Sequence, residues 1–253
     1  MSASASVADV ADEGAAGDPS LEARVAALDR AALERDLDAE GCAVVPSLLN
    51  AAQCAALSAS YADDAHFRAR IDMTRHGFGR GEYKYFAYPL PEPIATLRGA
   101  LYAHLQPIAN RWADAFGHAR RFPATHAQFL AECRAHGQAR PTPLLLRYRA
   151  GDYNRLHQDV YGERVFPLQA AVLLSAPGHD FEGGEFVLTE QRARMQSRAE
   201  VVPLRQGDAV VFAVRERPLA GVRGVQRLLM RHGVSRLRSG RRDVAGIVFH
   251  DAQ

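Results

Sequence analysis

The sequence predicts an α+β fold in which an N-terminal helical layer supports a C-terminal double-stranded β-helix, a form of jelly roll. In residues 20–143, apolar side chains recur at the roughly 3.6-residue spacing of helices. From residue 144 onward, short segments rich in β-branched residues are separated by Gly, Pro, Asp and Asn, which is typical of β-sandwiches and barrels. A chain of 253 residues that is 47% hydrophobic can bury a substantial core, so we expect one main domain with accessory helices.

The helical part follows a leader, residues 1–19, whose small and polar residues predict disorder. Ser20 is placed to cap a helix that runs to Gly41, because glycine is common just after a helix end. The strongest helical periodicity contains Trp112. This segment, residues 93–116, is one of three further predicted helices, and the other two cover residues 51–64 and 125–137.

The chain is therefore divided into a disordered leader (1–19), a mostly helical support region (20–143) and a double-stranded β-helix core (144–253). The predicted strands of the core read LLLRY, LQAAVLL, GEFVLTE, EVVPL, DAVVFAV, QRLLM, GVSRL and VAGIVFH.

Composition limits the setting in which the protein acts. The formal net charge is +2, so charge alone indicates no acidic partner, and Lys84 is the one lysine among 31 basic residues. Three widely spaced cysteines form no CxxC pair and predict reduced thiols. The N-terminal residues lack a secretory signal pattern, and no apolar run approaches the length of about 18 residues that a membrane span needs. We expect a cytoplasmic protein with no membrane association and no obligate protein partner.

Two residues after the first predicted core strand could share a metal ion. His157 and Asp159 are separated by one residue, and alternate residues of a strand face the same side. Two histidines and one carboxylate on one face leave coordination positions open, which is the arrangement of non-haem Fe(II) oxygenases. We expect His232, which lies 75 residues after His157, to be the third ligand.

Arg242 follows His232 by ten residues and begins the next predicted strand. Its guanidinium could hold a carboxylate through two parallel hydrogen bonds, which a lysine cannot match. The alternative third ligands, His179 and His250, have no such arginine after them. The neighbouring Arg241 should point to the opposite face of the strand and stay in solvent.

These features resemble the Fe(II)/2-oxoglutarate-dependent oxygenase superfamily. The segment from His232 to Arg242, HGVSRLRSGRR, resembles the distal histidine element of the prolyl-hydroxylase-like branch, where an arginine or lysine follows the histidine by about ten residues. The other matching segments are HQD at 157–159, GGEF at 183–186 and GDAVVF at 207–212.

The resemblance implies a dioxygenase that uses Fe(II), 2-oxoglutarate as co-substrate and O2. It implies that His157, Asp159 and His232 hold the iron and act in catalysis, and that Arg242 binds 2-oxoglutarate. Tyr148 matches a tyrosine that helps to hold the co-substrate in AlkB-type nucleic-acid demethylases; core packing is the alternative role for this residue.

The segments RYRAGDYNRLHQD, FEGGEFVLTEQ and RHGVSRLRSGRR resemble more closely a bacterial family described as oxygenases that act on damaged nucleic acid. Leu146, however, stands where AlkB-type enzymes have an asparagine. We therefore predict a dioxygenase that hydroxylates or oxidatively demethylates its substrate, with damaged nucleic acid as the first candidate. A protein or amino-acid hydroxylase of the prolyl type and a non-catalytic metal-binding jelly roll are the alternatives.

Two arginine-rich regions bear on the substrate. Residues 75–86 interleave aromatic side chains with Arg75, Arg80 and Lys84, as a base-stacking or peptide-gripping surface would. Residues 215–242 are also rich in arginine, which predicts either a nucleic-acid track or a solvated face.

Overall fold

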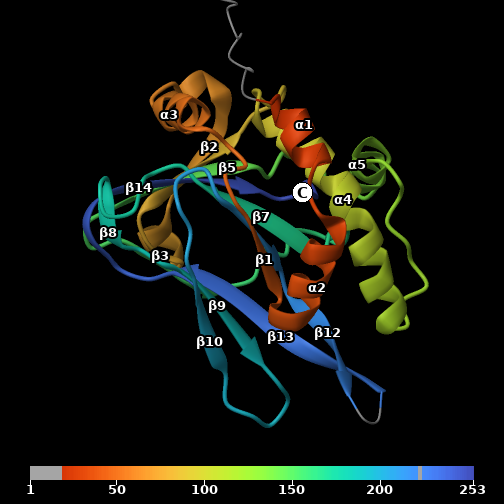
Figure 1. Cartoon of the computed structure of the whole chain (residues 1–253). Helices are drawn as coiled ribbons and strands as arrows, with labels where there is room; N and C mark the ends of the chain where they lie inside the picture. The colour runs from red at the N-terminus through yellow and green to blue at the C-terminus, as the bar shows by residue number, and fades with distance from the viewer. Residues whose placement is uncertain (1–18, 222–223) are drawn as a thin grey trace, which may run out of the picture.

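Two antiparallel β-sheets lie face to face in the computed structural model, which describes residues 19–221 and 224–253 (Figure 1). The predicted leader, apart from Pro19, lies outside these residues. In spatial order, the larger sheet consists of β1 (Cys42–Val45), β11 (Ala209–Ala213), β7 (Leu168–Leu173), β14 (Leu237–Ile247), β5 (Leu144–Arg149), β4 (Glu82–Phe86) and β2 (Phe67–Asp72), with β8 (Phe181–Gly183) paired to β14. The smaller sheet consists of β10 (Arg198–Val202), β9 (Phe186–Gln191), β13 (Gly224–Val234), β6 (Tyr153–His157) and β3 (Gly79–Arg80), with β12 (Glu216–Gly221) paired to β13.

The helices gather around the larger sheet, with α1, α2, α4 and α5 on one side of the molecule and α3 at another edge (Figure 1). Their bounds are α1 (Leu21–Ala26), α2 (Arg30–Glu40), α3 (Ala51–Ser60), α4 (Ile94–Ala115) and α5 (His126–Ala135), and the short 3-10 helices are η1 (Asp64–His66) and η2 (Met73–His76). None of the described helices combines the length and apolarity needed to cross a bilayer.

The predicted helix from Ser20 to Gly41 is two helices. The Ser20 hydroxyl caps α1 as expected, and Gly41 follows the last residue of α2. The break occurs because Asp29 caps a new helix: its Oδ1 accepts a hydrogen bond from the backbone N–H of Ala32, 3.0 Å away.

The strand pattern of the last third also differs from the prediction. QRLLM and GVSRL were expected to be separate strands, but QRLLM and the first two residues of GVSRL lie in one strand, β13, and the last residue of GVSRL begins β14. Gly233 does not interrupt this strand. It allows a close approach of β6, because a Cβ at Gly233 would lie 2.8 Å from the carbonyl oxygen of Asn154.

Strand pairing crosses the division expected at residue 144. β1 pairs with β11 at one edge of the larger sheet, and β4 pairs with β5 near the other. The N-terminal part of the chain therefore contributes strands as well as helices to the body that holds the cavity described below.

Helix α4 ties the N-terminal part to the C-terminal end of the chain. Its apolar side chains at roughly four-residue spacing, Leu97, Leu101 and Leu105, are fully buried. Beside them, the buried Arg98 guanidinium donates to Asp251 Oδ1 at 2.7 Å and to the carbonyl oxygen of Val248 at 2.8 Å. This is an ion pair without solvent, in which each partner neutralises the other.

Replacing one partner should destabilise the fold strongly. We expect Arg98→Met to lower the free energy of unfolding by about 3–5 kcal/mol, because Asp251 would keep a buried, unpaired charge. Urea unfolding followed by circular dichroism measures this loss. Arg35→Met, which removes an exposed ion pair with Asp36, should change the same quantity by less than about 1 kcal/mol. Equal losses of unfolding free energy in Arg98→Met and Arg35→Met would contradict a stabilising role of the buried Arg98–Asp251 ion pair.

Candidate metal centre

Three side chains that can ligate a metal meet between the two sheets. The antiparallel register of β6 and β13 places His157 directly opposite His232. Asp159 Oδ1 lies 3.5 Å from His157 Nε2, and Asp159 Oδ2 lies 3.4 Å from His232 Nε2. One potential ligand atom from each residue lies within 4.8 Å of the others, so one ion could contact all three. Within residues 19–221 and 224–253, no other group of three such residues is found.

The local reason for this meeting differs from the one expected. The sequence placed His157 and Asp159 on one face of a strand, but β6 ends at His157 and Asp159 lies in the following loop. The pairing of β6 with β13 brings the two histidines together, with ring centroids 4.2 Å apart. The loop then turns the aspartate back toward them.

Hydrogen bonds on both oxygens hold the Asp159 carboxylate. The Tyr161 hydroxyl donates to Oδ1 at 2.7 Å, and the Gln169 amide Nε2 donates to Oδ2 at 2.9 Å. Burial acts to raise the pKa of Asp159, but contacts with His232, His157 and Tyr161 outweigh it and hold the pKa well below its usual range. The carboxylate is therefore ionised, which metal binding requires.

Both imidazoles present Nε2 to the centre. His157 Nδ1 lies 2.7 Å from the carbonyl oxygen of Arg155, a contact that places the proton on Nδ1 and leaves Nε2 free as a ligand atom. His232 packs against the rings of Phe186 and Phe212. Burial and the neighbouring His157 lower the pKa of His232, so it remains neutral and able to ligate near neutral pH.

Sequence reasoning missed Tyr161 and Gln169. Tyr161 follows Asp159 by two residues, and this spacing beside a candidate ligand was an available signal. Gln169 gave none, because it lies on β7 of the opposite sheet and reaches Asp159 only in the folded chain.

The cavity that contains the three ligand residues also contains Arg242 and Tyr148. Arg242 is 2% exposed, and its Nε and Nη1 make no hydrogen bond within the described part of the chain. Burial lowers the pKa of Arg242 to about 10, so the guanidinium is still charged at neutral pH. A buried charge without an ion-pair partner is costly, and an anion bound in the cavity would compensate it.

Tyr148 lies next to this guanidinium. Its ring centroid is 5.7 Å from Arg242 Cζ, and its buried hydroxyl makes no hydrogen bond of ordinary geometry. Burial raises the pKa of Tyr148 to about 12, which keeps the hydroxyl protonated and able to donate. Arg241, in contrast, has a side chain that is 56% exposed, so β14 has the strand register that the sequence indicated.

The two alternative histidines lie outside the group. His179 is in an exposed turn, with Nδ1 2.8 Å from Asp180 Oδ1. His250 is buried behind Tyr161, with ring centroids 6.0 Å apart, and its Nδ1 is 3.4 Å from the backbone nitrogen of Phe166. The fold brings His232 to the centre and leaves these two elsewhere.

Lys84 cannot contribute to a substrate surface, which corrects the interpretation of residues 75–86. Its side chain is buried, and Nζ donates to the carbonyl oxygen of Tyr61 at 2.8 Å and to Asp64 Oδ1 at 2.5 Å. The reason is that α3 and η1 cover this part of β4, which the sequence pattern could not reveal.

The arginine-rich region 215–242 divides in a similar way. Arg217 is buried and donates to Glu190 Oε2 at 2.6 Å, and Arg242 lies in the cavity. Arg227 is exposed but pairs with Glu216 and lies over the Phe116 ring. The described residues of this region therefore do not form one continuous positive track.

Comparison with known proteins supports the chemistry that this centre suggests. Residues 81–252 match the model of a family described as "Oxygenase, catalysing oxidative methylation of damaged DNA". The chain belongs to this oxygenase family. An uncharacterized protein of Mycobacterium tuberculosis, matched in two strains, is 47% identical over 167 residues, which cover 66% of this chain and 72% of that protein.

Solved structures share the fold of this oxygenase. A prolyl-4-hydroxylase of Pseudomonas putida aligns with a TM-score of 0.53 and 17% identity, over 89% of this chain and all of that one. A prolyl hydroxylase of Trichoplax adhaerens, solved with a hypoxia inducible factor peptide, aligns with a TM-score of 0.52 and 12% identity, over 90% and 91% of the two chains. The non-heme alpha ketoglutarate dependent epimerase SnoN aligns with a TM-score of 0.52 and 14% identity, over 86% of this chain and 81% of that one. The expected resemblance to the Fe(II)/2-oxoglutarate oxygenases is confirmed.

A graded series of variants tests the metal centre. We expect Asp159→Ala to lose most of its affinity for Fe(II) or Mn(II), since it loses a ligand, while keeping its circular dichroism spectrum. Tyr161→Phe keeps the ligand but frees one carboxylate oxygen, and should weaken metal binding about 10- to 100-fold. Anaerobic metal titration measures both losses.

His179→Ala serves as the control in this series, because it removes an imidazole that contacts a different aspartate. Its metal affinity should equal that of the unmodified protein. Full affinity in Asp159→Ala would show that the metal binds elsewhere.

Proposed function

We propose that the protein is an Fe(II)- and 2-oxoglutarate-dependent dioxygenase that hydroxylates or oxidatively demethylates damaged nucleic acid. One observation carries the proposal: a single cavity is lined by the His157, Asp159 and His232 group and by the buried, unpaired guanidinium of Arg242. The first is a metal site with open positions, and the second calls for a small anion. The two facing antiparallel sheets around this cavity are then a double-stranded β-helix, and the three buried free cysteines favour a cytoplasmic setting.

The donor set fits Fe(II), because two imidazoles and one ionised carboxylate match this borderline ion. Bound iron, together with 2-oxoglutarate and O2, supplies oxidation of a substrate C–H bond, with oxidative loss of CO2 from the co-substrate. The chain's own task is to hold the ligand atoms in place before binding. Tyr161 and Gln169 do so for the carboxylate, and the contact with the Arg155 carbonyl does so for His157.

Arg242 and Tyr148 fit the far carboxylate of 2-oxoglutarate. The unpaired guanidinium nitrogens can donate to this carboxylate, and the Tyr148 hydroxyl can add a further hydrogen bond. Both groups are buried, so water competes weakly for these bonds. This end of the cavity would orient the co-substrate relative to the metal site.

The substrate assignment rests on the family description and on the cavity wall. Phe78, Tyr83 and Tyr161 line the cavity, and its described lining contains no charged group besides Asp159, Arg242 and any protonated histidine. Such a wall suits an uncharged planar group, for example a base out of its stack. A prolyl-type hydroxylase is the second candidate, favoured by the ten-residue spacing from His232 to Arg242 and by the prolyl hydroxylases among the similar folds.

Coupled turnover tests the proposed function. With Fe(II), O2 and 2-oxoglutarate, succinate should form in proportion to oxidised product when a methyl-damaged single-stranded oligonucleotide is added. Mass spectrometry of the oligonucleotide measures the product. Coupling instead to a proline-containing peptide would support the second candidate. An absence of 2-oxoglutarate binding would refute both.

The co-substrate site can be tested separately from the metal. We expect Arg242→Met to weaken 2-oxoglutarate binding by about 30- to 150-fold, the equivalent of about 2–3 kcal/mol for a lost charge-assisted interaction, with metal affinity unchanged. Because the substitution also removes a buried, unpaired charge, the melting temperature without 2-oxoglutarate should stay the same or rise.

Arg241→Met is the matched control, since it changes the exposed neighbour on the same strand. Its affinity for 2-oxoglutarate should match that of the unmodified protein. If Arg241→Met, rather than Arg242→Met, weakens binding, the co-substrate lies on the other face of β14. Calorimetric titration with Mn(II) in place of iron measures both affinities.

A further inference from the structure

An arginine-rich groove lies beside the cavity. Arginines from β2, η2, β3 and β5 line it, together with fewer carboxylates. One of the arginines, Arg147, is neutralised by two hydrogen bonds to Asp243, so the other lining residues carry an excess of one positive charge. The arginines are Arg70, Arg75, Arg80, Arg147 and Arg149, and the carboxylates are Asp72, Glu82 and Asp152. No charge of this groove faces the cavity, whose lining is a separate set of residues.

Most of these arginines have a carboxylate nearby but remain open to solvent. The side chains of Arg75 and Arg80 are 82% and 65% exposed, and their Nε atoms lie 3.6 Å and 3.3 Å from Asp72 and Asp152. Exposed pairs at these distances hold an arginine weakly, so its other nitrogens can bind a further anion.

Arg149 has no ion pair within the described residues, and the β5–β14 register places it directly opposite Arg241. Arg241 has a carboxylate beside it, with its Nε 3.4 Å from Asp243 Oδ2, so Arg149 is the member of this pair that has no anion of its own. The exposed Arg149 guanidinium is therefore available to bind a further anion in the groove.

Residues 73–81, here called the docked loop, separate the groove from the cavity. Phe78 lines the cavity, while Arg75, His76 and Arg80 line the groove. The loop is fixed against β6, because the backbone N–H of Arg155 donates to the Phe78 carbonyl oxygen at 2.9 Å. Gly79 permits this contact: its φ is 145°, and a Cβ there would lie 2.3 Å from the Tyr153 carbonyl oxygen.

The docked loop also presents an aromatic surface. The rings of His76 and Phe78 stack with centroids 5.3 Å apart and planes 19° apart, and Phe78 remains 46% exposed. An exposed aromatic face next to arginines is the combination by which proteins hold single-stranded nucleic acid: bases stack on the ring and phosphates lie along the charges. An acidic peptide would use the arginines but would leave the stacking face unused.

We infer that the groove binds the phosphates of a single-stranded DNA segment, and that Phe78 stacks against the base that enters the cavity. The inference rests on the proposed function, because the bound strand must reach the same cavity. The docked loop would then act on both sides at once: its arginines hold the backbone and its aromatic ring positions the base.

The salt dependence of DNA binding tests the groove. Arg75→Gln/Arg149→Gln removes two charges that hold little of the structure, and the dissociation constant of a short fluorescein-labelled single strand is measured by anisotropy at several salt concentrations. Each neutralised phosphate contributes about 0.7 to the slope of log affinity against log salt, so the slope should fall by up to about 1.4. Arg75→Lys/Arg149→Lys keeps both charges and should keep most of the slope.

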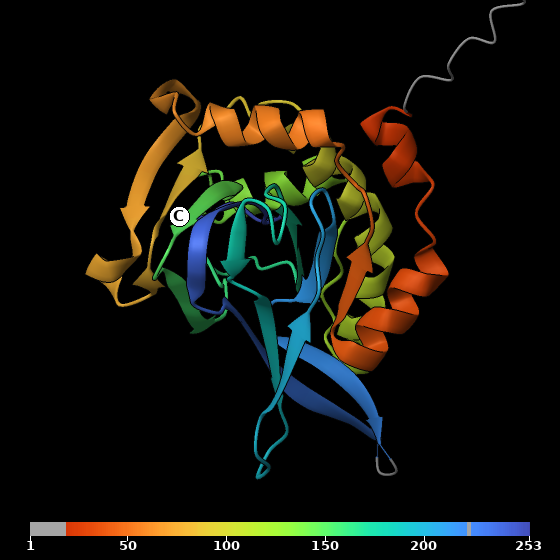
Figure 2. The ribbon, with the colours of Figure 1, turned by 60° about the vertical axis from the view of Figure 1, so that its left-hand side comes forward.

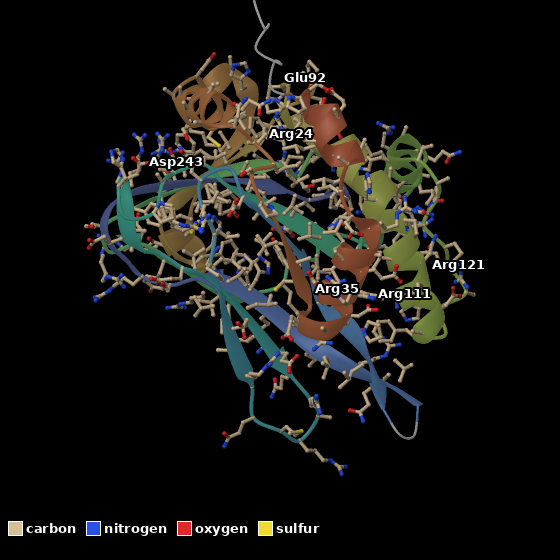
Figure 3. The ribbon with its side chains drawn as sticks, viewed as in Figure 1. Arg24, Arg35, Glu92, Arg111, Arg121 and Asp243 are labelled. Carbon is tan, nitrogen blue, oxygen red and sulfur yellow. The ribbon has the colours of Figure 1, made fainter. Side chains whose placement is uncertain are left out.

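The matched control is Arg35→Gln/Arg121→Gln, which removes two exposed charges near α2 and α4, on the side of the molecule away from β2 and β3 (Figures 2 and 3). This variant should have the slope of the unmodified protein. Phe78→Ala should weaken binding about 5- to 150-fold through lost stacking, with an unchanged slope.

Mn(II) and 2-oxoglutarate titrations of the same samples distinguish a failure of the proposed function from a failure of the groove as a DNA-binding site. If the unmodified protein binds neither, the proposed function fails. If it binds both, but Arg75→Gln/Arg149→Gln has an unchanged slope, the groove inference alone is overturned. Binding of polyglutamate in the groove, with no binding of the oligonucleotide at low salt, would overturn it in favour of an acidic peptide.

Discussion

The antiparallel pairing of β6 with β13 is the constraint on which the metal centre depends. It places His157 opposite His232, and the loop after β6 then needs to return only one carboxylate to complete the group. Side chains alternate between the faces of a strand, so a shift of one residue in this register would turn one histidine out of the cavity. The pairing shifts register just after His232, between His232 and Val234, and the missing Cβ of Gly233 lets β13 approach the backbone of β6 closely at this point. A backbone contact thus determines where the ligand atoms lie.

Two charged groups in the cavity are held in opposite ways. The Asp159 carboxylate is compensated within the protein by Tyr161, Gln169 and the two imidazoles, so it is ready to bind a cation without rearrangement. Arg242 is left uncompensated, with unpaired nitrogens and a pKa lowered by burial to about 10. The folded protein therefore carries a cost at Arg242 that a bound anion would relieve.

Local spacing predicted much of this centre, and contacts between distant segments explain what it missed. His157, Asp159, His232 and Arg242 could be selected because a short motif and a ten-residue spacing tie them to strands. Ser20, Gly41 and Trp112 mark helices for similarly local reasons. Gln169 could not be found, since it reaches Asp159 from the opposite sheet. The break before α2 was missed because the apolar periodicity continues across Asp29, although aspartate is a preferred helix cap.

The arginines show why composition is a poor guide to function in this chain. Arg98 and Arg217 are buried in ion pairs that hold the fold, and their charges are fully used. Lys84, counted at first among substrate-facing cations, is used in the same way by Tyr61 and Asp64. Arg149 is exposed and has no ion pair among the described residues, which costs little in water, so it indicates a ligand only together with the other groove arginines and the stacked rings of His76 and Phe78. Arg242 alone is both buried and without an ion pair among these residues, and no solvated state offsets its cost. Burial combined with the lack of a partner, rather than the number of arginines, is what identifies a binding group.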